Sequence, residues 1–393
     1  MTKVSGRMAR LPAYAVAKIA TTKRRLLAEG KDVIDMGAGD ADLPPPEVAV
    51  RTLAEALKDP KMSRYAFQTG LLEFRQAAAR YMERRFGVKL DPIAELLPLL
   101  GSKDGLAHLT FAALDAGDAC LIPEPGYSPY QGGTVLAGGE PIVYPLRPDN
   151  GFLVELGDLP RDQLARIKLV FLNYPNNPTT AVAPRDYLER TVKICRERGI
   201  VLAYDNPYCD VTFDGYVAPS IFEIPGAKEV AVEFHSLSKS FCMTGWRIAW
   251  VAGNPQMIAA LQQVKNFTDT GPFLAIQKAA AATLDQAEKI IPGVVETFRR
   301  RRDAAVTALA GIGLQVERPR ATMYLWVPLP DGLPSGPFAG QLLDEEYVAV
   351  LAGSSFGPGG EGFFRVALTV NEDRFREAAV RIGRVLERAR QAV

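Results

Sequence analysis

The chain has 393 residues, and 46 lysines and arginines against 45 aspartates and glutamates give it a formal net charge of +1. This balance lacks the basic excess of a dedicated binder of nucleic acids or anionic membranes. With 48% hydrophobic and 23% charged residues, the composition is that of an ordinary globular protein, long enough for two or three domains.

The cysteines and histidines indicate neither a disulfide framework nor a metal centre. The four cysteines include no C-x-x-C pair, and two histidines are too few for a histidine-rich metal site. We expect His108 and His235 to be packing or turn residues. No apolar stretch reaches the about 18 residues of a membrane span, and the first residues lack the apolar core of a secretory signal. We therefore expect reduced thiols and a cytoplasmic location.

Short apolar segments recur through the middle of the chain and predict strands. Most are continuous runs of four or five residues, which suits strands buried on both faces. Residues 184–198 form the clearest helical pattern between them, with Pro184 at its start and Gly199 after its end. Strand, helix and strand at this spacing predict βαβ units and a mostly parallel sheet. The predicted strands are 119–122, 142–144, 168–172, 200–204, 230–234 and 248–251.

The pattern changes after about residue 285. Residues 297–310 and 372–392 have the periodicity of long amphipathic helices, whereas 322–327 and 362–368 are typical of antiparallel strands. The fold class is therefore α/β: a large domain over 46–284 with helices on both faces of its sheet, and a smaller α+β domain. We interpret the basic run 299–302 as a solvated helix face.

Polar residues follow three of the predicted strands, where an open parallel sheet binds its ligands. They are an amide, a carboxylate with a phenol three residues later, and a lysine between hydroxyls. We expect these groups to meet at one edge of the sheet. In chain order they are Asn176 and Asn177, then Asp205 and Tyr208, then Ser236, Ser238 and Lys239, followed by Arg247.

Pyridoxal phosphate would use all of these groups. A lysine at a buried strand end can form a Schiff base with an aldehyde, and Lys239 has that position. The cofactor ring needs a carboxylate beside its nitrogen, which Asp205 could supply, and neutral donors to its phenolic oxygen, for which Asn177 and Tyr208 are suited. Taken singly, Asp205 could be a helix cap and Asn177 a turn residue. Their joint occurrence in this order favours the cofactor.

The phosphate of that cofactor needs an arginine, hydroxyls and the N-terminus of a helix. Arg247, Ser236 and Ser238 could supply the first two. The third is the segment Gly101, Ser102 and Lys103, which opens a helical pattern with unpaired backbone N–H groups.

These motifs resemble those of the fold-type I, pyridoxal-phosphate-dependent aminotransferases of class I and II, over nearly the whole chain. The resemblance implies that Tyr127 stacks on the cofactor ring, that Arg365 binds the substrate α-carboxylate and that Gly39 lies against the substrate. The matching motifs are Gly37-x-Gly39, Tyr65-x-x-x-x-Gly70, Gly101-Ser102-Lys103, Pro125-Gly126-Tyr127, Asn176-Asn177-Pro178-Thr179, Asp205-x-x-Tyr208, Ser236-x-Ser238-Lys239, Gly245-Trp246-Arg247 and Phe364-Arg365-Val366.

The resemblance also implies an assembly. Tyr65 would reach the phosphate in a neighbouring subunit, so the enzyme would be a homodimer with shared active sites. The small domain would combine both chain ends, residues 1–45 with 285–393.

Three local features depart from simple motif matching. Thr180 stands where the family usually has glycine, and Asp40, Ala41 and Asp42 replace a common Gly-x-Pro-Asp pattern near the substrate entrance. Residues 357–362 spell G-x-G-x-x-G, yet a dinucleotide site requires a helix after the glycines, and the next residues are typical of a strand. We therefore expect a loop before Arg365 and no NAD site.

The expected reaction is transamination, with Lys239 moving the substrate α-proton and Asp205 and Tyr208 as its catalytic partners. Motifs such as Lys265-Asn266-x-x-Asp269-x-Gly271 are similar to the branch that contains LL-diaminopimelate aminotransferase. Aspartate, alanine, aromatic amino acids and methionine remain alternative donors, with 2-oxoglutarate as a typical acceptor. A β-lyase on the same fold and a non-catalytic regulator are the rival functions.

Overall fold

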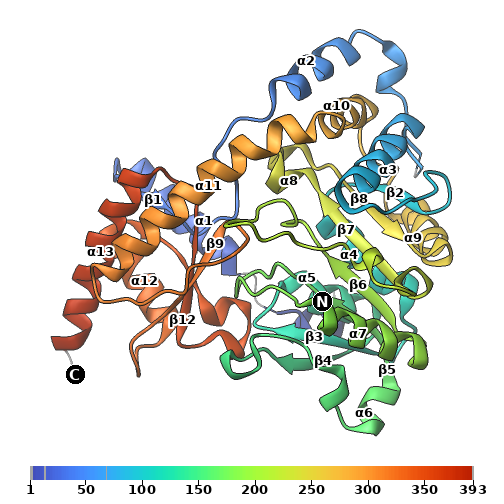
Figure 1. Ribbon diagram of the computed structural model, residues 1–393. Helices are drawn as coiled ribbons and strands as arrows, with labels where there is room; N and C mark the ends of the chain where they lie inside the picture. The colour runs from blue at the N-terminus through green and yellow to red at the C-terminus, as the bar shows by residue number, and fades with distance from the viewer. Residues whose placement is uncertain (1–2, 13–14, 68, 392–393) are drawn as a thin grey trace.

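The computed structural model describes residues 3–12, 15–67 and 69–391, and in these ranges two bodies of secondary structure lie side by side (Figure 1). The larger body contains a sheet of seven strands in the order β2-β8-β7-β6-β5-β3-β4. Strands β3 to β7 run parallel, and β8 is antiparallel to both of its neighbours. Their bounds are β2 Leu96–Leu99, β3 Ala119–Glu124, β4 Glu140–Pro145, β5 Ile167–Leu172, β6 Val201–Asp205, β7 Ala231–Ser236 and β8 Ala249–Gly253.

All six strands predicted for this sheet are confirmed, within one or two residues at each end. The missed strand is β2, which contains Pro98. A proline inside an apolar run argues against a strand, but it is tolerated at a sheet edge, and β2 pairs only with β8.

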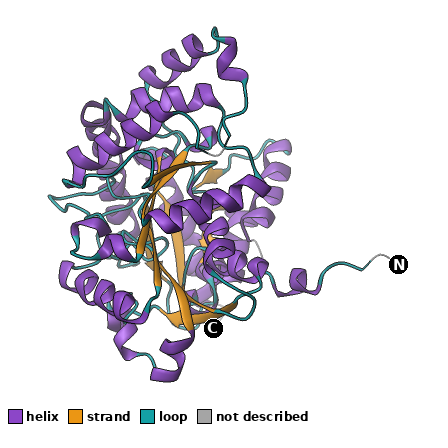
Figure 2. Cartoon of the chain, turned by 90° about the vertical axis from the view of Figure 1, so that its right-hand side faces the viewer, coloured by secondary structure: helices purple, strands orange, loops and turns teal. Residues whose placement is uncertain are grey.

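Helices cover both faces of the sheet, which Figure 2 shows in side view. Side chains of α4 and α9 pack on one face with Phe234 and Val251. On the other face, α7 packs against β5 and β6, and α3 and α10 pack against Trp250 on β8. The helices are α2 Glu47–Ala56, α3 Leu72–Phe86, α4 Ser102–Ala113, α5 Ser128–Ala137, α6 Arg161–Arg166, α7 Arg185–Arg198, α8 Leu237–Ser240, α9 Pro255–Thr268 and α10 Leu274–Leu284.

The smaller body contains a three-stranded antiparallel sheet, β11-β12-β9, and a two-stranded parallel pair, β1-β10. Because β1 comes from the N-terminal region and β10 from the C-terminal region, this body joins both ends of the chain. We propose a larger domain of residues 46–284 and a smaller domain of residues 1–45 with 285–393. In the smaller domain, residues 1–2, 13–14 and 392–393 lie outside the described ranges. Its elements are α1 Ala15–Ala28, β1 Ile34–Asp35, α11 Ala287–Ala310, β9 Tyr324–Pro328, α12 Ser335–Glu346, β10 Val348–Ala349, β11 Leu351–Ala352, β12 Phe363–Ala367 and α13 Glu372–Gln391.

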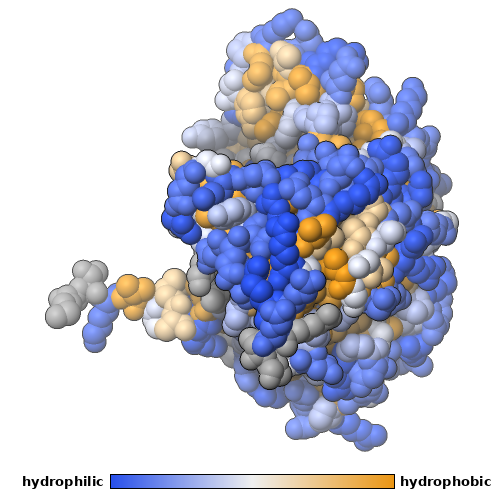
Figure 3. Space-filling view, turned by 90° about the vertical axis from the view of Figure 1, so that its left-hand side faces the viewer, coloured by the Kyte–Doolittle hydropathy of each residue, from blue (hydrophilic) through white to orange (hydrophobic). Residues whose placement is uncertain are grey.

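The predicted helix at 297–310 is the second half of α11, which begins ten residues earlier and continues through Pro292. In Figure 1, α11 runs from the large body into the small one. The outer side of the small body is mostly hydrophilic (Figure 3), where the charged face of α13 meets solvent. Within the described ranges, no helix combines the length and apolar character that crossing a membrane requires.

The interpretation of residues 299–302 as a solvated face is wrong for two of its four arginines. Arg301 and Arg302 are 5% and 0% exposed. Each guanidinium binds a carboxylate from a distant loop, Arg301 that of Asp42 and Arg302 that of Asp214. Those partners lie 259 and 88 residues away in the sequence, so local charge patterning could not reveal them.

Candidate active site

A cavity of about 480 Å³ lies where the carboxyl ends of the parallel strands face the small body. It brings together every candidate site residue proposed from the sequence except Tyr65. Those on its wall are Gly39, Ser102, Lys103, Tyr127, Asn177, Asp205, Tyr208, Ser236, Ser238, Lys239, Arg247 and Arg365.

Lys239 lies on the short helix α8, directly after the buried strand β7. Ser236 ends that strand and caps the helix, because its hydroxyl accepts a hydrogen bond from the backbone N–H of Ser238. The Lys239 ammonium points into the cavity and donates to the carbonyl oxygen of Gly39. A nucleophilic amine is therefore fixed at the junction of the two bodies.

Asp205 is the last residue of β6 and is 4% exposed. Its Oδ2 accepts a hydrogen bond of 2.6 Å from the Tyr130 hydroxyl, whereas its buried Oδ1 has no hydrogen-bond partner. Burial raises the pKa of Asp205 to about 7, although the Tyr130 hydrogen bond and the Lys239 charge lower it. A buried carboxylate with one open acceptor is what a protonated ring nitrogen requires, so Asp205 fits the cofactor inferred from the sequence.

Arg247 and Gly101 pack against each other in the region expected to bind the phosphate. Arg247 donates to the carbonyl oxygens of Thr244 at 2.9 Å and Leu100 at 3.4 Å, which holds its guanidinium beside the start of α4. A side chain on Gly101 would collide with that guanidinium. Gly101 also has a φ of 87°, in the left-handed region that glycine tolerates. With Ser102, Ser236 and Ser238 on the same wall, this region has the donors that a phosphate needs.

Arg365 enters the cavity from β12 and is 4% exposed. One terminal nitrogen donates to Asn177 Oδ1 at 2.7 Å and the other to the carbonyl oxygen of Gly37 at 2.8 Å. Its guanidinium carbon lies 4.1 Å from the centre of the Tyr324 ring, and its Nε has no partner. The Arg365 guanidinium is thus held in place, and its remaining N–H groups can bind an anion.

The turn after β5 accommodates Thr180 at the position where the family usually has glycine. This residue has a φ of 64°, in the left-handed region usually taken by glycine, and its N–H still donates to the Asn176 carbonyl. The backbone N–H of Asn177 is held by the Asn173 side chain at 2.8 Å. The amide of Asn177 therefore keeps its place despite the substitution.

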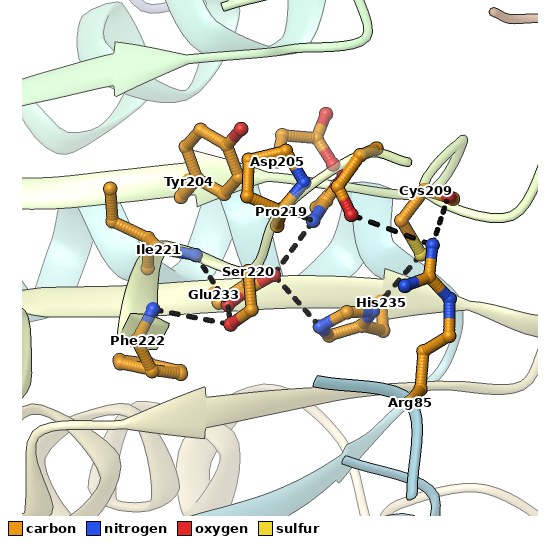
Figure 4. Close-up of polar contacts among 12 residues, drawn as sticks. Arg85, Tyr204, Asp205, Cys209, Pro219, Ser220, Ile221, Phe222, Glu233 and His235 are labelled. Carbon is orange, nitrogen blue, oxygen red and sulfur yellow. Dashed lines mark hydrogen bonds and ion pairs between the residues drawn. The ribbon is translucent and has the colours of Figure 1, made fainter. Parts of the chain in front are cut away.

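A buried polar cluster anchors the loop that carries Asp205 and Tyr208 (Figure 4). The Asn206 amide donates to Glu233 at 2.8 Å on the neighbouring strand. At the other end of the loop, Arg85 forms a 3.0 Å ion pair with Asp210 and donates to the Cys209 carbonyl. The loop is therefore tied to β7 and to α3.

Neither histidine lies on the cavity wall. His235 stacks on Trp250 with ring centres 4.9 Å apart and lies 3.1 Å from Glu233. His108 lies with Asp104 and Asp269 in a group close enough to share a metal ion, but the buried ammonium of Lys265 binds both carboxylates, at 3.3 and 2.8 Å. That lysine and Asp269 belong to the motif noted in the sequence, which here joins α4 to the end of α9.

Tyr65 is the one predicted residue outside the cavity. It is 70% exposed, and its ring lies 6.0 Å from that of Phe67. Its predicted role in a neighbouring subunit stays a prediction.

The sequence analysis missed two tyrosines of the site. Tyr130 holds Asp205, and Tyr324 reaches the cavity from β9. Tyr130 comes one helical turn after Tyr127, a spacing that could have indicated it, whereas Tyr324 is an ordinary residue of the predicted strand 322–327 and has no such local signal.

Comparison with known proteins places these features in a family. Residues 31–382 match the family model "Aminotransferase class I and II". The chain is 43% identical over 376 residues to the LL-diaminopimelate aminotransferase of Desulforudis audaxviator, covering 96% of each chain. It is 42% identical over 380 residues to that of Moorella thermoacetica, covering 97% of each.

Solved structures agree. Substrate-bound BacF from Bacillus subtilis superposes with a TM-score of 0.95 at 31% identity, covering 98% of both chains. A probable N-succinyldiaminopimelate aminotransferase from Thermus thermophilus superposes with a TM-score of 0.89 at 39% identity, covering 94% of this chain and all of the other.

Proposed function

We propose that this chain, which belongs to the class I and II aminotransferases, moves the amino group of LL-diaminopimelate to a 2-oxo acid such as 2-oxoglutarate. Family membership confirms the fold type, the pyridoxal phosphate cofactor and the transfer of amino groups between amino acids and 2-oxo acids, all expected from the sequence. The identity of the donor is the new element. The observation that carries it is 43% identity, over almost the full length, to an enzyme of that name.

The charges of the cavity support this donor. LL-diaminopimelate has an ammonium and a carboxylate at each end of the molecule. Arg365 would hold the α-carboxylate of the reacting end, and the cavity wall also contains Asp40, a carboxylate outside the set assigned to the cofactor. Asp40 would pair with the distal ammonium of this donor, which an aromatic or aliphatic donor lacks.

We assign the cofactor contacts to residues of the large body. Lys239 would bind the aldehyde, Tyr127 the ring face, and Asn177 and Tyr208 the phenolic oxygen. The phosphate would lie among Ser102, Lys103, Ser236, Ser238 and Arg247. Bound pyridoxal phosphate would supply an electron sink for the carbanion formed at the substrate.

The protein would hold and move the protons. Asp205 Oδ1 would accept a hydrogen bond from the protonated ring nitrogen, since it is the open acceptor at that end. Lys239 Nζ would take the proton from the substrate α-carbon and return it to the aldehyde carbon of the cofactor, on the other side of the transferred nitrogen. Gly39 would lie against the substrate, and its missing side chain leaves room for the Tyr324 hydroxyl, with which a Cβ would collide.

We also propose a cytoplasmic homodimer with shared active sites. Tyr65 supports this proposal, because an exposed aromatic side chain outside its own cavity is free to enter that of another subunit. Sedimentation would give the oligomeric state. Mixing Y65F and K239A subunits under exchange should restore activity if each site uses residues of two chains, and no recovery under proven exchange would remove Tyr65 from the site.

A donor panel tests the substrate. Purified enzyme loaded with cofactor is offered LL-diaminopimelate, N-succinyl-LL-diaminopimelate, aspartate, alanine, phenylalanine and methionine with 2-oxoglutarate, and the oxo-acid products are measured. We expect the highest kcat/KM for LL-diaminopimelate. A clear preference for another donor would overturn the substrate but not the reaction, and pyruvate and ammonia formed without an acceptor would indicate a β-lyase.

A further inference from the structure

Tyr324 occupies a position in the cavity that the proposed mechanism does not use. It lies on β9, is 2% exposed and forms part of the cavity wall. Its ring is fixed from one side by the Arg365 guanidinium, 4.1 Å away. Its oxygen lies 3.1 Å from the Tyr208 oxygen. The phenol is therefore rigid and close to the reacting groups.

The Lys239 ammonium reaches two oxygens of the small body. It donates a hydrogen bond to the Gly39 carbonyl, and it interacts electrostatically with the Tyr324 hydroxyl. The two are neighbours, because a side chain on Gly39 would collide with the Tyr324 oxygen. Both oxygens therefore lie near the charged end of Lys239.

We propose that Tyr324 is a further catalytic residue, which binds the Lys239 ammonium whenever this side chain carries the substrate proton. This inference rests on the proposed role of Lys239 as the base. Tyr324 and the Gly39 carbonyl would hold the charged amine over the substrate, and the Tyr208 hydroxyl would fix the orientation of the phenol from behind.

The proton balance of this step is simple. The neutral Lys239 amine uses its lone pair to take a proton from the substrate α-carbon, and the bonding electrons stay on the substrate side. The resulting ammonium would donate to Tyr324 and Gly39 and would then return a proton to the aldehyde carbon of the cofactor, on the other side of the transferred nitrogen. Tyr324 remains a phenol throughout, so lysine and tyrosine both finish in their starting states.

Electrostatics supports the pairing of these groups. Burial alone would raise the pKa of Tyr324, but the charges of Lys239 and Arg365 and the hydrogen bonds of Tyr208 and Lys239 lower it below its ordinary value. Tyr208 is equally buried, and its pKa is raised well above the ordinary value. The charged groups on the cavity wall are Asp40, Lys103, Asp205, Lys239, Arg247 and Arg365.

The first test uses the protein without its cofactor. The ultraviolet absorbance of tyrosinate is followed during alkaline titration, and the difference between wild type and Y324F isolates Tyr324. We expect it to ionise below the ordinary tyrosine pKa of about 10. K239A should move this ionisation upward, because the neighbouring cation is gone. An ionisation that K239A leaves in place would show that the two groups do not interact.

The second test separates the hydroxyl from the ring. Y324F keeps the ring on Arg365, so kcat should fall about tenfold to a hundredfold while KM for the donor changes little. Y324L loses the ring as well and should also raise KM. Y187F removes the hydroxyl of a fully buried tyrosine on α7, whose partner is the Val154 carbonyl, and should leave both constants unchanged.

The outcomes are distinct. Normal kcat in Y324F with an inactive K239A would overturn the role of Tyr324 and leave the proposed function intact. Normal turnover in K239A would overturn the proposed function itself. An equal loss of folded protein in Y324F and Y187F, by thermal denaturation, would assign Tyr324 to packing alone.

Discussion

The two walls of the cavity are built differently. The large-body wall consists of residues at or just after the ends of consecutive strands, such as Asp205 at the end of β6 and Lys239 after β7. The small-body wall consists of residues from segments far apart in the chain, such as Gly39, Tyr324 and Arg365. Strand ends are set by short-range sequence, whereas the second wall depends on long-range packing. The first wall can therefore be predicted from motifs, and the second only in part.

The largest expected effect is on the large-body wall. K239A removes the amine that lies directly after β7 and donates to the Gly39 carbonyl, so transamination should fall by more than about ten-thousandfold. Donor-dependent formation of 2-oxo acid measures it. K193A is the matched control, because Lys193 lies exposed on α7 and pairs with Glu197 across one helical turn. Substantial turnover in K239A would show that Lys239 is not the catalytic lysine.

Asp205, on the same wall, should make the stability of the cofactor-free protein depend on pH. Because burial raises the pKa of Asp205 to about 7 in the cofactor-free protein, the native state binds this proton more tightly than the unfolded chain does. Its contribution to stability is thus fully present below the ordinary aspartate pKa of about 4 and is lost as pH rises toward 7.

The expected loss is up to about 4 kcal/mol, because a shift of about three units is involved at about 1.4 kcal/mol per unit. Urea unfolding at several pH values measures it, with D205N as the control that lacks the titration. Cofactor binding should flatten the wild-type curve. Parallel curves for wild type and D205N without cofactor would contradict the burial argument.

Arg301 tests whether the small-body wall depends on long-range contacts. Its bidentate pair with Asp42 holds the loop that carries Gly39 and Asp40. R301Q should cost about 1–2 kcal/mol in stability, because the buried guanidinium loses its hydrogen bonds to Asp42 and to the Leu368 carbonyl, and should raise KM for the donor more than it lowers kcat. R300Q is the control, since Arg300 is exposed and forms an ion pair with Glu372 at 3.5 Å. Equal effects of R301Q and R300Q would show that the Arg301–Asp42 pair does not position the loop that carries Gly39 and Asp40.

The same contrast explains what the sequence could and could not predict. Six strands and the positions of Asn177, Asp205 and Lys239 followed from apolar runs and the polar residues after them. Arg365 and Gly39 required a family resemblance, because nothing local indicates that they face Lys239. Tyr324 and the Arg301–Asp42 pair were missed. A tyrosine at the start of a strand and an arginine in a basic helix are common on surfaces, and tertiary contacts bury these two.

The smallest expected effect concerns the turn after β5, where the large-body wall departs from its family pattern. Thr180 has a φ of 64°, and a β-branched residue in this region is strained. T180G should therefore stabilise the protein by about 1 kcal/mol, reduced by the greater freedom of glycine in the unfolded chain. T180N should gain less, and T180A almost nothing, since alanine keeps the Cβ that causes the strain. Chemical denaturation resolves these steps. Activity should stay unchanged, because the Asn177 N–H is held by Asn173 and not by the turn. A loss of activity in T180G that T180A does not share would mean that this strain positions Asn177, and a wall assigned to local sequence would then depend on stored strain as well.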